Sequence, residues 1–167
     1  MLFIPLGLAA LAWLATEIGA GDPAFALCVA LVSLGSAPFV GDALARALPH
    51  RWSAVPDRAL TVFHRLGAGW FNRFLSLIGW NALILRMRQP LQSPSDAVDY
   101  ARSLRASAAG HSWGLILHLV FAVTALVTAG VPAALLILVP GLLLHAYPVI
   151  LQLIGLHRLE PILAARR

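Results

Sequence analysis

The feature that most constrains this fold is a set of long apolar runs near the two ends of the chain. Because the hydrocarbon core of a bilayer is about 30 Å thick, a helix needs about 20 apolar residues to cross it. Four runs approach this length, namely residues 1–19, 23–40, 113–129 and 132–153. The chain is also 60% hydrophobic and only 11% charged, whereas soluble domains are about a quarter charged. We therefore predict an all-α, polytopic membrane protein with four transmembrane helices.

Short segments with turn signals separate these runs. Glu17, Gly21, Asp22 and Pro23 lie between the first and second runs, and Gly130-Val131-Pro132 predicts a tight turn between the third and fourth. The first run is similar to a secretion signal, but it has no Lys or Arg before its apolar core, so we interpret it as a true span. The length accommodates a single membrane domain, residues 1–167, without a separate soluble catalytic module.

The segment 41–110, between the second and third runs, has a different composition. It carries nine arginines and four aspartates, and its turn signals are Pro49, Pro56, Pro90 and Pro94. Mixed apolar and basic stretches such as 59–66 indicate amphipathic helices that lie in the headgroup region, with the arginines toward water. Ser95 and Asp96 predict the N-terminal cap of a helix that continues through Asp99, Arg102 and Arg105 into the third span.

The distribution of arginine predicts an orientation. The chain has a net charge of +5 and contains no lysine. Every arginine lies in the segment 41–110 or at the C-terminus, as Arg158, Arg166 and Arg167, and the two short connections between spans have none. The positive-inside rule therefore places the segment 41–110 and both termini in the cytoplasm. Arginines dispersed between apolar helices favour anionic headgroups or a phosphate-bearing substrate as partners, and they argue against nucleic acid.

The last apolar run ends in an unusual group of polar residues. His145, Tyr147, Pro148 and Gln152 follow one another at a position where polar groups are expensive unless they have a partner or a function. His145 and Gln152 are seven residues apart, so on a helix they lie on nearly the same face. Pro148 has no N–H to donate to the Leu144 carbonyl, which is therefore free to accept another hydrogen bond. These polar residues therefore indicate that the segment forms a binding site.

A second polar stripe begins the third span. His111 and His118 lie on one helix face with small and polar residues, namely Ser107, Gly110 and Gly114. The spacing of the two glycines predicts a close approach by another backbone. If this stripe faces His145, two or three imidazoles surround one cleft near the cytoplasmic surface, where an imidazole can act as a general base. The alternative is that these histidines are packing residues that hydrogen-bond neighbouring helices.

Several kinds of site have no support in the sequence. Neither polar stripe contains a carboxylate that could orient a catalytic histidine. The single cysteine, Cys28, lies in an apolar run and cannot form an intrachain disulfide. No Cys or His pair has zinc spacing, and no glycine-rich phosphate loop is present. We therefore expect no bound cofactor and no metal site.

Three segments between about Phe71 and Leu159 resemble a family of small bacterial membrane proteins named for glycosyl-4,4'-diaponeurosporenoate acyltransferase, which acylates the sugar of a carotenoid. They are Ile78-Gly79-Trp80-Asn81, the stretch from Arg105 to His111, and Tyr147-Pro148-Val149-Ile150-Leu151-Gln152 with Arg158-Leu159. The chain departs from the family pattern at two places. Ala108 stands where the family has a glutamate, and Leu153-Ile154-Gly155-Leu156 replaces a basic Arg-Tyr-Asn-Arg core.

The resemblance implies an acyltransferase of the bacterial inner membrane that acts in carotenoid biosynthesis. His111 would take the proton from a hydroxyl of a glycosylated isoprenoid or another amphiphile, and His145 or Gln152 would support the developing oxyanion. Acyl-CoA would be the donor, with its phosphates held by Arg105 and Arg158, while Tyr147 and His118 would contact substrate. Two alternatives stay open. One is a non-catalytic subunit that binds lipid or pigment or assists assembly, and the other is a lipid methyltransferase, which no nucleotide-binding signature supports.

Overall fold

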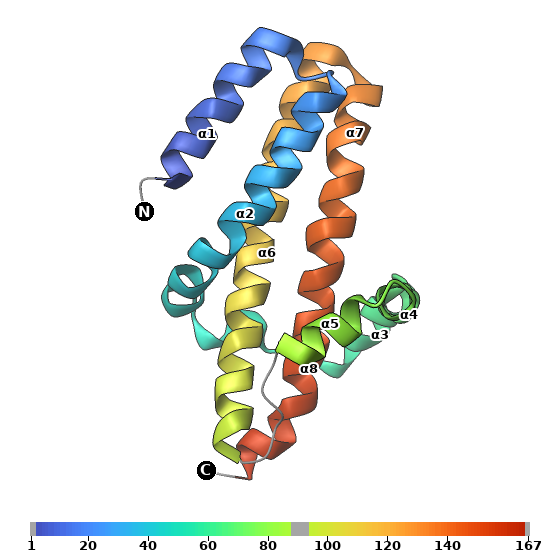
Figure 1. Ribbon diagram of the computed structural model, residues 1–167. Helices are drawn as coiled ribbons and strands as arrows, with labels where there is room; N and C mark the ends of the chain where they lie inside the picture. Colours follow the sequence, from blue (N-terminus) through green and yellow to red (C-terminus); the bar gives the residue numbers. More distant parts are fainter. Residues whose placement is uncertain (1–2, 88–93, 166–167) are drawn as a thin grey trace. The chain divides into compact units, whose positions relative to one another are not determined.

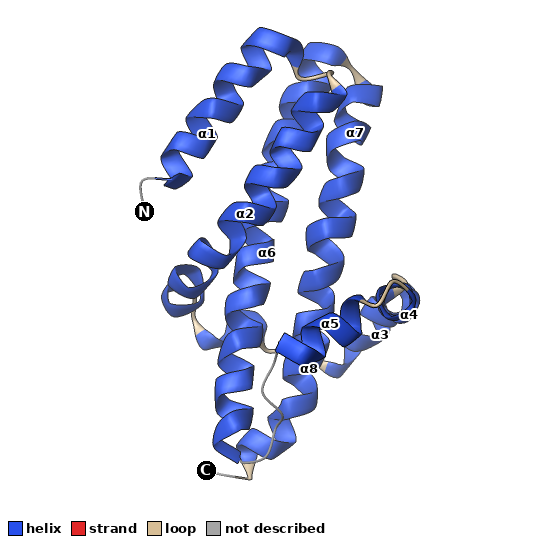
Figure 2. Ribbon diagram, viewed as in Figure 1, coloured by secondary structure: helices blue, strands red, loops and turns tan. Residues whose placement is uncertain are grey.

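The chain is helical throughout the described regions. The computed structural model describes residues 3–87 and 94–165, and every regular element in these two ranges is a helix (Figures 1 and 2). The predicted all-α class is therefore confirmed for the described residues. Met1, Leu2, Pro90, Arg166 and Arg167, which entered the predictions of spans, turns and orientation, lie outside them.

Among the described residues, three helical segments are long and apolar enough to cross a membrane. They are α2 (Pro23–Ala47), α6 (Pro94–Ala129) and the continuous run from Val131 to Ala164. This last run consists of α7 (Val131–Gly141), a π-helical turn η3 (Leu142–Ala146) and α8 (Tyr147–Ala164). The second, third and fourth predicted spans fall within these segments.

The described part of the first predicted span is short, so the prediction of four spans is not confirmed. The N-terminal segment forms α1 (Phe3–Leu14) followed by a π-helical turn η1 (Ala15–Gly19), and its apolar part runs from Ile4 to Gly19. At 1.5 Å per residue this part is about 24 Å long, which is less than the hydrocarbon thickness of about 30 Å. The predicted cytoplasmic position of both termini requires an even number of crossings, so it depends on α1 and stays a prediction.

The turns lie where the sequence predicts them. Before α2, Gly19 has a φ of +82° and the Asp22 carboxylate accepts a hydrogen bond of 2.7 Å from the Ala24 N–H. Between α6 and α7, Gly130 has a φ of +87°, and Pro132 lies at the start of α7. Both glycines use the left-handed region that other residues rarely adopt, and a proline in the first turn of a helix removes only a donor that has no partner there.

The arginine-rich segment forms the short helices that its amphipathic pattern predicts. These are the 3₁₀ turn η2 (His50–Ser53), α3 (Asp57–Arg65), α4 (Ala68–Leu77) and α5 (Trp80–Met87). Helix α6 then begins at Pro94 and continues to Ala129, which confirms that the helix through Asp99 and Arg105 runs into the third span. It begins at Pro94, before the predicted cap, so Ser95 and Asp96 lie inside its first turn.

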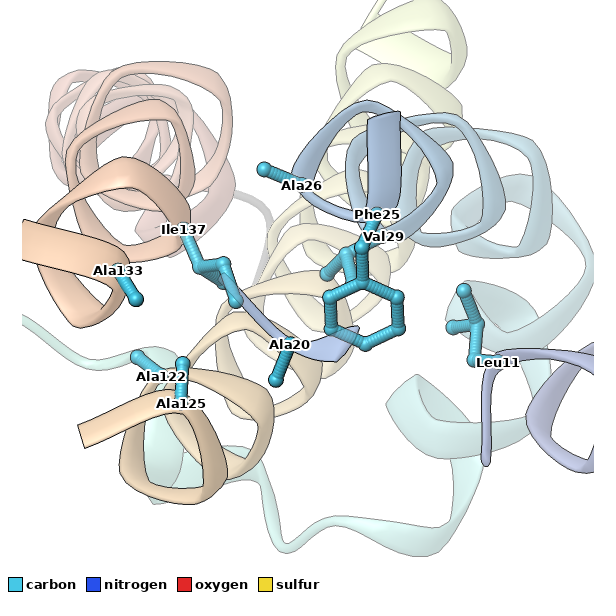
Figure 3. Packing of buried hydrophobic residues seen from close by; sticks show 9 residues of the cluster. All are labelled: Leu11, Ala20, Phe25, Ala26, Val29, Ala122, Ala125, Ala133 and Ile137. Carbon is cyan, nitrogen blue, oxygen red and sulfur yellow. The ribbon is translucent and has the colours of Figure 1, made fainter. Parts of the chain in front are cut away.

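The described residues group into two compact units. The first contains residues 1–47 and 106–149, and the second contains residues 48–105 and 150–167. One apolar core of the first unit includes Leu11, Phe25, Val29 and Ile137, each fully buried (Figure 3). The Phe25 ring meets the Phe121 ring edge to face, with centroids 5.5 Å apart. In the second unit, α6 and α8 pack through a core of Ala101, Leu104, Leu156 and Leu159.

Small residues bring α2 and α6 of the first unit into backbone contact. A Cβ atom added to Gly110 would collide with the Ala37 carbonyl, and one added to Gly41 would collide with the Ala106 carbonyl. The close backbone approach predicted from the spacing of Gly110 and Gly114 is therefore confirmed at Gly110. Such contacts give van der Waals packing, which is what holds helices together where lipid is as apolar as the side chains.

We expect Gly41→Ala to destabilise the protein. The added methyl group has no room beside the Ala106 carbonyl, so α2 and α6 must separate, at a cost of about 1–3 kcal/mol. Gly35→Ala is the matched control, because Gly35 is on the same helix and a Cβ there meets nothing within 4 Å. Reversible unfolding in detergent micelles measures both. Equal stability of the two variants would contradict the close packing of α2 and α6.

Candidate functional site

Ser33, on α2, lies at the centre of a buried polar cluster in the first unit. Its Oγ is 2.9 Å from His145 Nε2 and 3.1 Å from His118 Nε2. Ser33, His118 and His145 are all fully buried. They come from three different segments, α2, α6 and η3, so the cluster joins all three helical segments that are long enough to span a membrane.

His111 extends this cluster toward the edge of the first unit. It lies on α6, is half-buried, and its Nδ1 atom is 3.2 Å from His145 Nδ1. At the other end, His118 Nδ1 is 2.8 Å from the backbone carbonyl of Ile137 on α7. The ring of His145 stands between the other two, with centroid separations of 5.3 Å on both sides. The result is a chain of contacts in the order His111, His145, Ser33, His118 and Ile137.

A neutral imidazole carries one proton on one of its two ring nitrogens. The hydrogen-bond partners of each ring indicate which nitrogen carries it. A carbonyl only accepts hydrogen bonds, so His118 carries its proton on Nδ1 and, when neutral, accepts at Nε2 from the Ser33 hydroxyl. The Ser33 oxygen then accepts from Nε2–H of His145, whose Nδ1 in turn accepts from Nδ1–H of His111. With all three rings neutral, this arrangement leaves the lone pair of His111 on Nε2.

The Ser33 hydroxyl has a second possible acceptor. Its Oγ is also 2.9 Å from the Ala30 carbonyl, one turn earlier on α2. If His118 gains a proton, its Nε2 becomes a donor to Ser33, and the hydroxyl proton can turn to Ala30. The cluster can therefore take up a proton by rotation of one hydroxyl, without movement of a helix.

Two glycines make room for the two buried rings. A Cβ atom on Gly114 of α6 would overlap the His145 imidazole, and a Cβ atom on Gly141 of α7 would overlap the first atoms of the His118 side chain. Gly114 was predicted to admit another backbone, and it admits an imidazole instead. The reason is that His145 projects from its own helix across the surface of α6, filling the space that a side chain at Gly114 would occupy.

The π-helical turn η3 carries His145. Within it, the N–H of Tyr147 donates to the Leu142 carbonyl, five residues earlier. Pro148 follows η3 and supplies no N–H to the Leu144 carbonyl.

The cluster occupies one half of the span depth. Counting 1.5 Å per residue, Ser33 is about 15 Å from the Pro23 end of α2, and His118 is about 16 Å from the Ala129 end of α6. His111 is about 27 Å from that same end of α6. The other half, between the cluster and these two ends, is filled by the apolar core of Phe25, Val29 and Ile137 (Figure 3). The imidazoles of α6 therefore lie about 16–27 Å from the Ala129 end of that helix.

The structure brings together three of the seven predicted site residues: His111, His118 and His145. Tyr147 is in the same unit, half-buried, two residues after His145. Gln152, Arg105 and Arg158 belong to the second unit, where Gln152 and Arg105 are half-buried and Arg158 is exposed. Within the described residues, no group of three or more His, Cys, Asp or Glu side chains is arranged to hold a metal ion.

Sequence reasoning missed Ser33, the residue that joins the three segments. Its only signal is a hydroxyl inside an apolar run, and a serine there commonly bonds a carbonyl of its own helix. Ser33 also makes that bond, to Ala30. The contact with both histidines depends on the three-dimensional packing of α2, α6 and η3, which the spacing of one serine does not reveal.

We expect Ser33→Ala to cost about 1–2 kcal/mol of stability, because His145 Nε2–H and His118 Nε2 lose their shared partner in a buried site. Ser112→Ala is the matched control, since Ser112 Oγ donates only to the Ala108 carbonyl of its own helix. Unfolding titrations of both variants in the same detergent make the comparison. A loss in Ser33→Ala no greater than that in Ser112→Ala would mean that Ser33 does not hold the cluster together.

Comparison of the chain with known protein families, with characterised proteins and with solved structures finds no match in any of the three.

Proposed function

We propose that this protein is a membrane-embedded acyltransferase in which His111 is the general base. The observation that carries the proposal is the position of the His111 ring. It is half-buried, and its Nδ1 lies 3.2 Å from Nδ1 of His145. In the interior, Ser33 Oγ contacts Nε2 of both His145 and His118. A base whose far nitrogen is fixed by a third group is the arrangement that activates hydroxyl groups in acyl-transfer enzymes.

The chemistry uses the lone pair on His111 Nε2. This nitrogen takes the proton of the acceptor hydroxyl as the oxygen attacks the carbonyl carbon of an acyl thioester. The carbon–sulfur bond then breaks, the new ester forms, and the leaving thiolate takes the proton back from His111. The donor is an acyl-CoA, and the acceptor is a hydroxyl of a glycosylated isoprenoid, such as a carotenoid glycoside, or another amphiphile. The resemblance of the segments around His111 and Tyr147 to the carotenoid acyltransferase family supports this choice.

His145, Ser33 and His118 serve as positioning residues in this proposal. Both nitrogens of His145 are engaged, one by His111 and one by Ser33, so His145 orients the base and is not available to an oxyanion. An imidazole in this position replaces the carboxylate that commonly orients a catalytic histidine. The roles that the resemblance implies for Gln152, Arg105 and Arg158, which belong to the second unit, stay predictions.

One observation favours a non-catalytic alternative. His118 and His145 are fully buried, and each of their four ring nitrogens has a partner. Polar side chains that bond across helices also hold transmembrane bundles together without any catalytic role. In that case the protein would be a lipid-binding or pigment-binding subunit, or an assembly subunit.

The test is acyl transfer by the purified protein in bilayers, with labelled palmitoyl-CoA as donor and dodecyl glucoside as a model acceptor. We expect wild-type protein to form the acylated glucoside, and His111→Ala to lower the rate about 100-fold or more, since a general base contributes about 10²–10⁴. His64→Ala is the matched control, because His64 is exposed on α3, and it should retain the wild-type rate.

Two results would count against the proposal. Equal rates in wild-type protein and His111→Ala would remove His111 from the mechanism. Absence of transfer by well-folded wild-type protein, with both the glucoside and a panel of glycosylated isoprenoids, would favour the non-catalytic alternative.

A further inference from the structure

The first unit contains a pocket of about 320 Å³ on a different face of α2 and α6 from the imidazoles. It is lined by residues of α1, α2 and α6, among them Gly7, Leu8, Val32, Gly35, Phe39 and Trp113. None of the three clustered histidines lines it. Pockets that bind small molecules commonly have volumes of about 300–1,000 Å³, so this one suits a single slender occupant.

The polar groups of the pocket wall are already satisfied by one another. Trp113 Nε1–H donates to Ser36 Oγ at 3.1 Å, and the Ser36 hydroxyl donates to the Ser33 carbonyl at 3.3 Å. Neither residue has a second polar hydrogen to offer. The other lining residues are apolar side chains and glycines. An occupant with polar groups would lose its hydrogen bonds with water and find at most the one remaining lone pair of Ser36 Oγ, so the wall favours hydrocarbon.

The pocket and the imidazole chain cover the same depth. Val32 and Phe39 lie about 14 Å and 24 Å from the Pro23 end of α2, counting 1.5 Å per residue. In the cluster, Ser33 lies about 15 Å from the Pro23 end of α2, and His111 lies about 27 Å from the Ala129 end of α6. Trp113 is two residues from His111 on α6, so the two side chains project from opposite sides of that helix.

We propose that this pocket binds one hydrocarbon chain of an amphiphile, with the polar head at the level of His111. The chain is a fatty acyl or prenyl tail, and the pocket sets the depth of the head along α6. This inference rests on the proposed function for the role of the head, whereas binding of the tail can be measured without any reaction.

Trp113 provides the measurement, because its ring lines the pocket. In a variant that keeps Trp113 and replaces the other four tryptophans by phenylalanine, a fatty acid brominated at mid-chain should quench the fluorescence on contact. We expect saturable quenching at one chain per protein. Competition by palmitoyl-CoA and by dodecyl glucoside, added separately, distinguishes a donor tail from an acceptor tail.

Gly35→Leu, in the same Trp113 background, should abolish the saturable component. A Cβ at Gly35 meets nothing within 4 Å, so the larger side chain can fill the pocket without displacing a helix. The control is Ala24→Leu, which adds a similar side chain at an exposed position of α2 outside the pocket, and it should leave quenching unchanged.

Quenching that rises linearly with probe concentration, and equally in Gly35→Leu and Ala24→Leu, would overturn the proposal, because ordinary lipid around the helices would then explain it. Saturable quenching without acyl transfer would leave the pocket assigned and reject the proposed reaction. We expect His111→Ala in the Trp113 background to bind the probe as the parent protein does. This variant therefore separates binding of the tail from the proposed acyl transfer.

Discussion

The hydroxyl of Ser33 is the contact on which the polar interior of this protein depends. A buried polar group without a partner is costly, and in a lipid environment there is no water to serve as one. Ser33 accepts a hydrogen bond from His145 and donates one to His118. One hydroxyl on α2 therefore provides a hydrogen-bond partner for a buried imidazole of α6 and for one of η3. The Ile137 carbonyl closes the chain at its inner end. These contacts give each imidazole one protonation pattern, and that pattern leaves one lone pair, on His111 Nε2, for chemistry.

The chain of imidazoles requires helices that approach unusually closely. Gly110 and Gly41 let α2 and α6 come into backbone contact, and Gly114 and Gly141 make room for the rings of His145 and His118. The positions of the glycines and the histidines therefore depend on each other, since the rings occupy the space that a side chain at Gly114 or Gly141 would fill. The apolar core around Phe25 and Ile137 fills the remaining depth, so the polar chain ends in the interior and does not continue to the far ends of α2 and α6.

Much of the fold could be predicted because it follows from composition and local signals. Apolar runs, Gly130 before Pro132 and the arginine-rich middle segment predict four spans, a tight turn and short amphipathic helices. In the described residues, three of the four spans lie in helices long enough to cross a membrane, and the turn and the short helices are present. The first span is not confirmed, because the described part of its apolar helix, Ile4–Gly19, is shorter than a helix that crosses a bilayer. In the site, the meeting of His111 with His145 could be anticipated from two polar stripes. Ser33 could not, because its role depends on which helices pack together.

The ordered protonation of the three imidazoles can be measured by nitrogen NMR of the histidine side chains. In protein labelled with ¹⁵N histidine, protonated and unprotonated ring nitrogens have well-separated shifts, and variants lacking each histidine assign the signals. We expect neutral rings with the proton on Nδ1 in His111 and His118 and on Nε2 in His145. A proton on Nδ1 of His145, or on Nε2 of His111, would show that the hydrogen bonds of the cluster do not run in this order.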